Sequence, residues 1–273
     1  MDPKLQRRIQ RYGWNKAAAE YEQSWQAQLG PAQSMLLEMA ALRAGQSVLD
    51  VACGTGLVTF AAAAAVGPGG RVVGVDLSEE MVERARAQAV RLGVAHVGFE
   101  RMDAEALDLP AASFDAAVCA LGLMYVPDPR EALGEMARVL APGGRAVAAV
   151  WGERSRCGWA EVFPIVDARV RSEVCPLFFA LGTADRLATM FRDAGLADVT
   201  AERLQTRLHW ASAEEACGAA FVAGPVALAY SRFDETARFA VREAYLASIE
   251  PWREGSGYAV PAEFVIVAGV RPA

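Results

Sequence analysis

The stretch Val48–Gly56, VLDVACGTG, predicts a buried strand that enters a tight turn and continues into a helix near Leu57. The apolar run is short and rich in β-branched residues, which is typical of an inner strand and not of a helix. Gly54 and Gly56 remove side chains where a ligand would approach the backbone, and the following helix points its positive end at the same place. The stretch therefore predicts a site for a nucleotide-type ligand.

Strand-like runs alternate with helical patterns from this stretch as far as Trp151. This alternation is typical of right-handed βαβ units in an α/β fold with a mostly parallel sheet, whose ligands lie beyond the carboxyl ends of the strands. Val199–Trp210 alternates like a strand with one exposed face, at the edge of the sheet or antiparallel to it, and Phe264–Val270 is apolar throughout, like an inner strand. The other predicted strands are Arg71–Asp76, His96–Met102, Asp115–Ala120 and Arg145–Trp151.

Helical patterns dominate the segments outside this alternation. Trp14, Tyr21 and Trp25 recur at helical spacing near the amino terminus, and Thr183 is predicted to cap a helix that runs to about Ala194. The predicted division is 1–44 as a helical cover with helices at 14–29 and 33–42, 45–151 as the ligand-binding core, 152–182 as a helical cap insertion, and 183–273 as the rest of the core with a helical insertion at about 212–250.

Composition excludes several classes of function. The net charge is −6 and no basic block stands out, which argues against a nucleic-acid partner. No uncharged run of about 18 apolar residues appears, so no membrane span is expected. The five cysteines are scattered without a CxxC pair, which fits a reducing cytoplasm, and with His96 and His209 as the only histidines no metal site is expected.

Three carboxylates specify the ligand of the glycine turn. Position 59 is Thr, so the third glycine of a dinucleotide fingerprint is missing, and Asp50 just before the turn would repel a pyrophosphate. Asp50 instead suits a positive group such as an α-amino group or a sulfonium. Asp76, at the next strand end, is placed to accept both hydroxyls of a ribose, and Asp103, at the third, is placed to accept from an adenine amino group.

These stretches resemble the successive motifs of a known family. VLDVACGTG, VVGVDLS, RMDAEALDLP, SFDAAVCALGLMYVPDP and REALGEMARVLAPGGR are similar to those of class I S-adenosylmethionine-dependent methyltransferases, in particular their ubiquinone/menaquinone C-methyltransferase-like branch. The resemblance covers residues 45–151. It implies a Rossmann-like, seven-stranded, mostly parallel sheet whose last strand inserts antiparallel between the fifth and the sixth.

The resemblance also implies a cofactor site for S-adenosylmethionine, with S-adenosylhomocysteine as the product. Ala52 departs from the family pattern, in which many members carry Gly, and its methyl group is small enough for binding to survive. Tyr21 reaches the cofactor if the amino-terminal helix folds over it. The cofactor-binding residues expected are Tyr21, Asp50, Ala52, Cys53, Gly54, Gly56, Asp76, Leu77, Met81, Asp103, Ala104, Ala120 and Leu121.

The expected reaction is methyl transfer by in-line displacement to a small hydrophobic or aromatic metabolite, because the cap segments are aromatic and carry few converging charges. No catalytic residue is assigned. Glu105 and Asp108 are predicted to be solvated loop acids and His209 a surface histidine. Two alternatives remain, a non-catalytic S-adenosylmethionine-binding regulatory module and a nicotinamide-dependent oxidoreductase. The candidates for the acceptor pocket are Trp14, Tyr125, Trp159, Phe163, Phe178 and Phe179.

Overall fold

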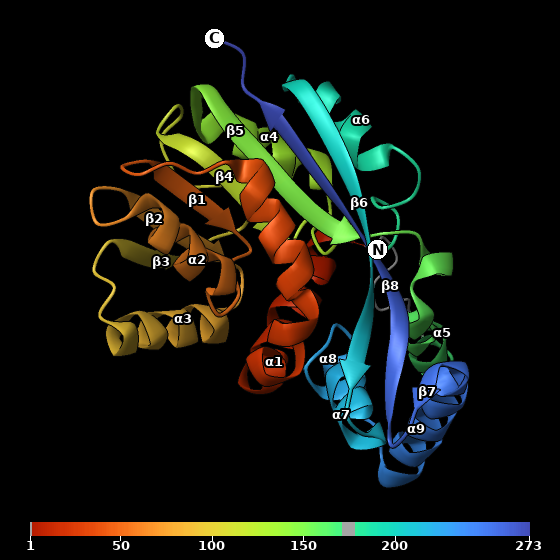
Figure 1. The fold of residues 1–273 in the computed structure, drawn as a ribbon. Coiled ribbons are helices and arrows are strands. Elements are labelled where there is room, and N and C mark those ends of the chain that lie inside the picture. Colours follow the sequence, from red (N-terminus) through yellow and green to blue (C-terminus); the bar gives the residue numbers. More distant parts are fainter. Residues whose placement is uncertain (1, 171–177) are drawn as a thin grey trace.

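The computed structural model describes residues 2–170 and 178–273 of the chain. One mixed sheet forms its centre, with helices on both faces (Figure 1). Seven long strands lie in the order β3-β2-β1-β4-β5-β8-β6, and a two-residue strand, β7, pairs with the start of β8. The strands are β1 (Ser47–Val51), β2 (Arg71–Asp76), β3 (Val97–Arg101), β4 (Phe114–Ala120), β5 (Leu140–Trp151), β6 (Ala197–Trp210), β7 (Arg253–Glu254) and β8 (Gly257–Val270).

Strand β1 lies where the winding of the sheet reverses. It pairs in parallel with β2 on one side and β4 on the other, so that Asp50 stands opposite both Gly74 and Val118. The chain leaves β1 toward one edge and returns at β4 to build toward the other edge. Ligands of α/β sheets bind at this kind of switch point, outside the carboxyl ends of the strands. The predicted α/β class and mostly parallel sheet are confirmed.

Strand β8 is the antiparallel inner strand that the resemblance implies. Ile266 stands opposite Ala149 of β5 and Glu202 of β6. The side chains of Phe264–Ala268 are at most 4% exposed. A strand with neighbours on both sides and helices over both faces buries every side chain, which explains why this run has no polar alternation. Strand β6 lies at the edge, as its alternation predicts.

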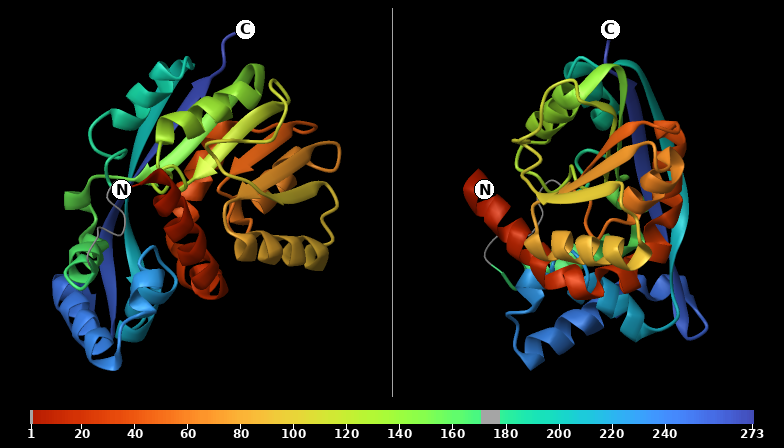
Figure 2. Two further views of the ribbon diagram at one scale, coloured as in Figure 1. Left: turned by 180° about the vertical axis from the view of Figure 1, so that it is seen from behind. Right: turned by 90° about the vertical axis from the view of Figure 1, so that its left-hand side faces the viewer.

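Helices cover the two faces of the sheet. Helix α1 crosses in front of the sheet in Figure 1, and the view from behind in Figure 2 shows α4 on the opposite face.

Helix α6 starts only at Arg186, and the Thr183 hydroxyl donates to the Phe179 carbonyl at 2.9 Å. The predicted cap at Thr183 is wrong because its hydroxyl is already bonded within the preceding turn. The helices are α1 (Pro3–Ala40), α2 (Leu57–Val66), α3 (Glu79–Leu92), α4 (Pro129–Val139) and α6 (Arg186–Asp193).

Helix α1 is continuous from Pro3 to Ala40, so the expected break into two helices after residue 29 is wrong. Pro31 lies inside the helix and lacks the N–H that an interior residue donates, which costs about 3 kcal/mol. The helix persists because Leu29 before the proline and Leu36 after it are both buried in the main core. Tertiary burial on one face therefore outweighs the local preference of Pro31.

A side-chain amide also fixes α1 to the edge of the sheet. Gln28 Oε1 accepts from the backbone N–H of His209 at 2.8 Å, and Gln28 Nε2 donates to the carbonyl of the same residue at 2.5 Å. The amide therefore uses the free backbone groups of an edge strand, as a neighbouring strand would. The His209 side chain itself is exposed, as the sequence predicts.

Most helices that follow β5 gather on a two-stranded ribbon, whereas α6 lies near the start of β6 (Figure 1). Strand β5 ends opposite Phe264, whereas β6 and β8 continue as a pair as far as Trp210 and Tyr258. Figure 1 shows this extension at the lower right, with helices around it. Helices thus occupy the described parts of both predicted insertions, while 171–177 lie outside the described residues. They are η1 (Arg154–Arg156), η2 (Gly158–Glu161), α5 (Val162–Asp167), α7 (Ala213–Cys217), η3 (Gly218–Val222), α8 (Ala227–Tyr230), α9 (Glu235–Ile249) and η4 (Glu250–Trp252).

Replacing Pro31 tests the continuity of α1. Because Pro31 is exposed and lies within the helix, we expect Pro31→Ala to stabilise the protein by about 1–3 kcal/mol by restoring a helical hydrogen bond. Urea unfolding measures this gain. Pro3→Ala is the matched control, since proline is tolerated at the first helical position and its replacement is expected to be nearly neutral. An unchanged or lower stability of Pro31→Ala would show that the helix breaks there.

Candidate active site

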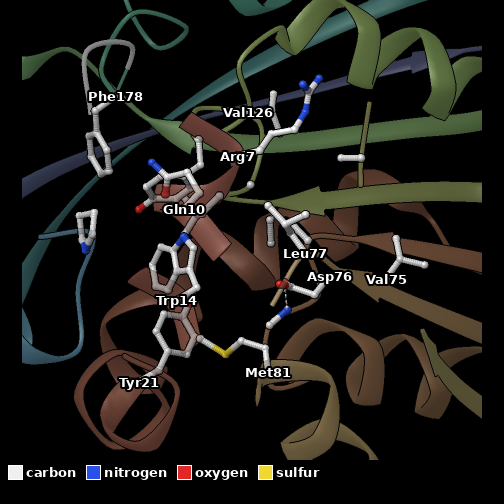
Figure 3. Close-up of a pocket in the computed structure, with 18 of the residues that line it drawn as sticks. Arg7, Gln10, Trp14, Tyr21, Val75, Asp76, Leu77, Met81, Val126 and Phe178 are labelled. Atoms are coloured by element: carbon white, nitrogen blue, oxygen red, sulfur yellow. Dashed lines mark hydrogen bonds between the residues drawn. The ribbon is translucent and has the colours of Figure 1, made fainter. Parts of the chain in front are cut away.

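A cavity of about 1010 Å³, measured with its open mouth, lies at the carboxyl ends of the central strands and under α1 (Figure 3). Gly54 follows β1, Asp76 ends β2, Asp103 follows β3, and Ala120 ends β4, and all four residues line it. Each strand end therefore contributes one part of the wall. The cavity has a polar end beside Asp76 and Asp103 and an aromatic end beside Trp151, which ends β5.

The structure brings most of the expected cofactor residues together in this cavity. Asp50 in β1 and Cys53 and Gly56 in the turn are not among its lining residues. The expected cofactor residues that line it are Tyr21, Ala52, Gly54, Asp76, Leu77, Met81, Asp103, Ala104, Ala120 and Leu121.

Asp76 is held in place by the backbone. Its Oδ2 accepts from the N–H of Gly54 at 2.9 Å, and its Oδ1 accepts from the N–H of Ser78 at 2.8 Å (Figure 3 shows the former bond). Burial raises the pKa of Asp76, and these backbone N–H groups oppose that rise. A carboxylate has about four lone-pair sites, more than these backbone donors occupy, so Asp76 keeps acceptor capacity for a ligand. The geometry leaves two acceptors at the end of β2, side by side, as a vicinal diol requires.

Asp50 supports the turn from beneath. Its side chain is 1% exposed and accepts from the Thr59 hydroxyl at 2.6 Å. Burial raises the pKa of Asp50 to about 7, although the bond from Thr59 lowers it. Thr59 occupies the position of the third glycine in a dinucleotide fingerprint, and the structure gives its hydroxyl a specific use. The turn therefore depends on a hydroxyl at the position where the dinucleotide motif needs a bare backbone.

Ala52 adopts a backbone conformation that normally favours glycine, with φ at 56°. Its methyl group packs against Gly122, where an added Cβ would overlap it. Both residues line the cavity between its polar and aromatic ends. The alanine that departs from the family pattern is thus accommodated by a glycine on the neighbouring strand end.

Glu105 is not the solvated loop acid that the sequence predicts. Its side chain is 4% exposed, and its Oε2 lies 2.9 Å from Nη2 of Arg7. Arg7 Nε also lies 2.8 Å from Asp103 Oδ2. The prediction failed because the cation that makes this burial possible comes from the amino-terminal helix. Asp108, by contrast, is exposed as predicted.

Aromatic rings form the other end of the cavity. The Trp14 ring packs edge to face against the rings of Tyr21 and Tyr125. Its centroid lies 5.6 Å from that of Tyr21 and 5.1 Å from that of Tyr125. Among the acceptor candidates, Trp14, Tyr125, Trp159 and Phe178 line the cavity, whereas Phe163 and Phe179 pack behind Trp159, at 5.8 and 5.9 Å. Edge-to-face pairs of this kind stabilise one another and leave ring faces for a ligand.

Tryptophans form the floor of this aromatic end. The Trp25 ring lies 6.1 Å from that of Trp151, 5.9 Å from Trp159 and 6.5 Å from Trp210. Trp151 was not predicted to line the site, and Trp25 was predicted only as part of the aromatic face of the amino-terminal helix. The position of Trp151 at a strand end, where ligands of such sheets bind, was a signal that could have identified it.

One face of α1 lines the cavity along most of its length. Figure 3 shows Gln10, Trp14 and Tyr21 following one another on the side of the helix that faces the cavity. Arg7 and Gln10 were missed because the helix was expected to begin only at residue 14. The residues of this face recur every three, four or seven positions; we call them the α1 stripe, and they are Arg7, Gln10, Trp14, Tyr21, Trp25 and Leu29.

Comparisons with known proteins agree with this arrangement. Residues 48–144 match a family model described as a methyltransferase domain. The demethylmenaquinone methyltransferase of Bacillus cytotoxicus is 33% identical over 182 residues, which are 61% of this chain and 74% of that protein. The chain belongs to the class I S-adenosylmethionine-dependent methyltransferases. Within this family it is a member of the ubiquinone/menaquinone C-methyltransferase-like branch.

Other relatives of this methyltransferase chain match over shorter stretches. The ubiquinone/menaquinone biosynthesis C-methyltransferase of Hahella chejuensis is 44% identical over 110 residues, 40% of this chain and 44% of that protein. The chain spans between 33% and 44% of the length of the first four curated relatives. A phosphoethanolamine N-methyltransferase of Haemonchus contortus, solved with S-adenosylmethionine, shares the fold at a TM-score of 0.63 and 17% identity over 95% of this chain and 57% of that one.

The described part of this methyltransferase chain has neither a membrane-spanning helix nor a metal-binding cluster. No helix there has the length and apolar character needed to span a membrane. Among residues 2–170 and 178–273, no group of three or more His, Cys, Asp or Glu side chains is arranged to hold a metal ion. The described cysteines, Cys53, Cys119, Cys157 and Cys217, are free and buried.

Asp50→Asn is expected to stabilise the protein increasingly as pH rises from 5 to 8. Burial raises the pKa of Asp50 to about 7, well above its value in the unfolded chain. Between those two values the unfolded chain has released the proton and the folded protein keeps it, so the wild-type protein loses stability with rising pH. Asn still accepts from Thr59 but carries no charge, which gives a relative gain of about 2 kcal/mol between pH 5 and 7.

Urea unfolding at pH 5, 6, 7 and 8 measures this effect. Asp108→Asn is the matched control because Asp108 is exposed. Its difference from the wild type is expected to stay constant over this range. A stability gain of Asp50→Asn that is the same at all four pH values would contradict the assigned pKa shift.

Proposed function

We propose that the protein binds S-adenosylmethionine at the polar end of the cavity and transfers its methyl group to a small, hydrophobic, aromatic acceptor at the other end. The observation that carries this proposal is a single cavity with two chemically different ends. Fixed carboxylates line one end and tryptophan rings the other, and Trp14 contacts the aromatic rings between them. Membership of the methyltransferase family supports the same reaction.

The residues at the polar end fit the cofactor. Asp76 keeps acceptor capacity for a ribose diol, and Asp103 lies one strand farther along for the adenine amino group. Gly54 has a φ of 55° and no side chain, which leaves the turn open to the methionine part. Asp50 and Asp76 are buried carboxyl groups close to the turn, and a ligand with a positive sulfonium group favours their ionised form.

The cofactor supplies an activated methyl group, and the protein residues then have to orient the acceptor and exclude water. Trp14, Tyr125 and the tryptophan floor present ring surfaces to a flat acceptor. Burial and the nearby carboxylates raise the pKa of Tyr21, so its phenol stays protonated and does not act as a general base. The aromatic walls exclude water, and a water-poor pocket favours the dispersal of the sulfonium charge in the transition state.

The acceptor class follows from the composition of this end. The lining residues Trp25, Trp151, Trp159 and Pro225 carry no charge, so a flat uncharged molecule replaces water there at the lowest cost. A protein or nucleic-acid acceptor does not fit a pocket floored by buried tryptophans. The buried free cysteines support a reducing compartment, and we infer the cytoplasm.

Ligand-dependent melting tests the cofactor. At a hundred times Kd, S-adenosylhomocysteine is expected to stabilise the protein by about 2.7 kcal/mol and to raise Tm by several degrees, whereas NAD has no effect. Protein freed of copurified ligand must be used. A shift with NAD alone would favour the oxidoreductase alternative, and no shift with either ligand would refute the proposed function. Release of S-adenosylhomocysteine with a panel of hydroxylated aromatic compounds then separates an enzyme from a non-catalytic binding module.

Asp76 is expected to dominate cofactor affinity. Asp76→Asn keeps the shape of the side chain and loses its charge, so we expect Kd for S-adenosylhomocysteine to rise at least about tenfold through loss of charge-assisted bonds to the ribose. Isothermal titration calorimetry measures this affinity. Asp108→Asn, which removes the same charge at an exposed position, should leave it unchanged. Equal affinities for the two variants would place the ribose elsewhere.

A further inference from the structure

An ion-pair cluster lies in the wall of the cavity; we call it the Arg7 cluster, formed by Arg7, Asp103 and Glu105. Arg7 Nε lies 2.8 Å from Asp103 Oδ2 and 2.9 Å from Glu105 Oε2, and Arg7 Nη2 lies 2.9 Å from the same Glu105 oxygen. The Glu105 side chain is 4% exposed, whereas those of Arg7 and Asp103 are 32% and 29% exposed. A carboxylate this deeply buried is costly without a cation, so Arg7 has a strong preference for this position.

The Arg7 cluster joins three parts of the chain that surround the cavity. Glu105 Oε1 accepts from the backbone N–H of Asp128 at 2.9 Å, which fixes the end of the loop that carries Tyr125. From α1, Gln6 Nε2 donates to the carbonyl of Tyr125 at 3.4 Å. Helix α1, the loop after β3 and the loop after β4 therefore meet at one set of charges.

The first turns of α1 are held differently from the rest of the helix. Besides the Arg7 cluster, Arg11 lies 3.8 Å from Glu79, and Asn15 Oδ1 accepts from the Ser78 hydroxyl at 2.6 Å. Farther along, apolar side chains buried to 4% exposure or less hold the helix, among them Trp25, Leu29, Ala32 and Leu36. Polar contacts between partly exposed side chains open at a lower free-energy cost than a packed apolar face.

We propose that Arg7 is the latch of a lid formed by residues 3–16 of α1, and that this latch sets how long the cofactor stays bound. The lid carries Arg7 and Gln10 over the polar end and Trp14 over the aromatic end, and all three line the cavity. Opening it therefore exposes both ends at once. This proposal rests on the proposed function, because it takes the adenine amino group to lie at Asp103.

The latch is compatible with a loaded site. Asp103 Oδ1 accepts from the N–H of Glu105 at 3.0 Å and its Oδ2 forms an ion pair with Arg7, which leaves lone-pair sites on both oxygens. An amino group can therefore bind Asp103 while Arg7 keeps its contacts with Glu105. Arg7 acts as a positioning residue, since it holds the lid and takes no part in methyl transfer.

Three variants test the latch through the dissociation rate of S-adenosylhomocysteine, measured by stopped-flow tryptophan fluorescence. Arg7→Gln removes the charge, and we expect the product to leave about tenfold faster because charge-assisted bonds are lost. Arg7→Lys keeps the charge without the forked geometry and should lie between Arg7→Gln and the wild type. Arg8→Gln is the matched control: it removes the same charge one residue away, at an exposed position, and should behave as the wild type does.

Salt gives a second readout that a merely structural role would not produce. Raising ionic strength screens partly exposed ion pairs, so dissociation from the wild-type protein should accelerate with salt, and dissociation from Arg7→Gln should respond much less. Equal dissociation rates for Arg7→Gln and Arg8→Gln would overturn the proposal. Slower dissociation from Arg7→Gln would also overturn it, because the cluster would then oppose binding.

Amide hydrogen exchange on the ligand-free protein separates this proposal from the cofactor assignment. Arg7→Gln should speed exchange in residues 3–16 and leave residues 25–36 unchanged, since the latter lie in the apolar core. Unchanged exchange in residues 3–16 would show that Arg7 does not hold the lid. If the wild-type protein bound no S-adenosylhomocysteine, the proposed function would be refuted. The hydrogen-exchange experiment on the ligand-free protein would then still decide whether Arg7 holds the lid. If Arg7→Gln fails to fold, the same exchange and dissociation measurements on Arg7→Lys test the proposal.

Discussion

The helical period of α1 is the constraint on which the rest of the site depends. The α1 stripe has to face the cavity over more than six turns, from Arg7 to Leu29, while the same helix continues beyond Pro31 into the core. A break at the proline would free the first half to rotate and would separate Trp14 from Tyr125. The burial of Leu36 therefore contributes to the shape of a cavity that it does not touch, because it holds the whole helix in one orientation.

The second constraint is the cost of burying the carboxyl groups beside the glycine turn, because burial disfavours their charged form. Asp50 and Asp76 are buried, and burial raises the pKa of both. Thr59 and the backbone N–H groups of Gly54 and Ser78 offset only part of that cost. A positively charged ligand offsets more of it, so the empty turn is less stable than the occupied one. The same charges would repel a pyrophosphate, which agrees with the missing glycine at position 59.

Features that depend on local order along the chain are well predicted by the sequence. Asp76 and Asp103 could be located because a βαβ unit places the carboxyl end of every parallel strand on the same side, so a residue at a strand end has a known position. The helix break expected near Pro31 is wrong because distant packing outweighs a local preference. Arg7 could not be predicted as a site residue because a polar residue upstream of Trp14 adds nothing to an apolar helical pattern. The burial of Glu105 could not be predicted because its partner, Arg7, lies 98 residues away in the sequence.

The two ends of the cavity also differ in where along the chain they come from. Gly54, Asp76 and Asp103 lie within residues 48–144, the range that the family model matches. Trp14, Trp25, Trp151, Trp159 and Pro225 lie outside it. A change at Trp14 or Trp25, or in the helices on the β6–β8 ribbon, therefore reshapes the aromatic end, whereas only the start of α1, through Arg7, reaches the carboxylates. In a chain built this way, relatives can share one cofactor site and still differ in the acceptor, so the acceptor has to be inferred from the rings of this chain.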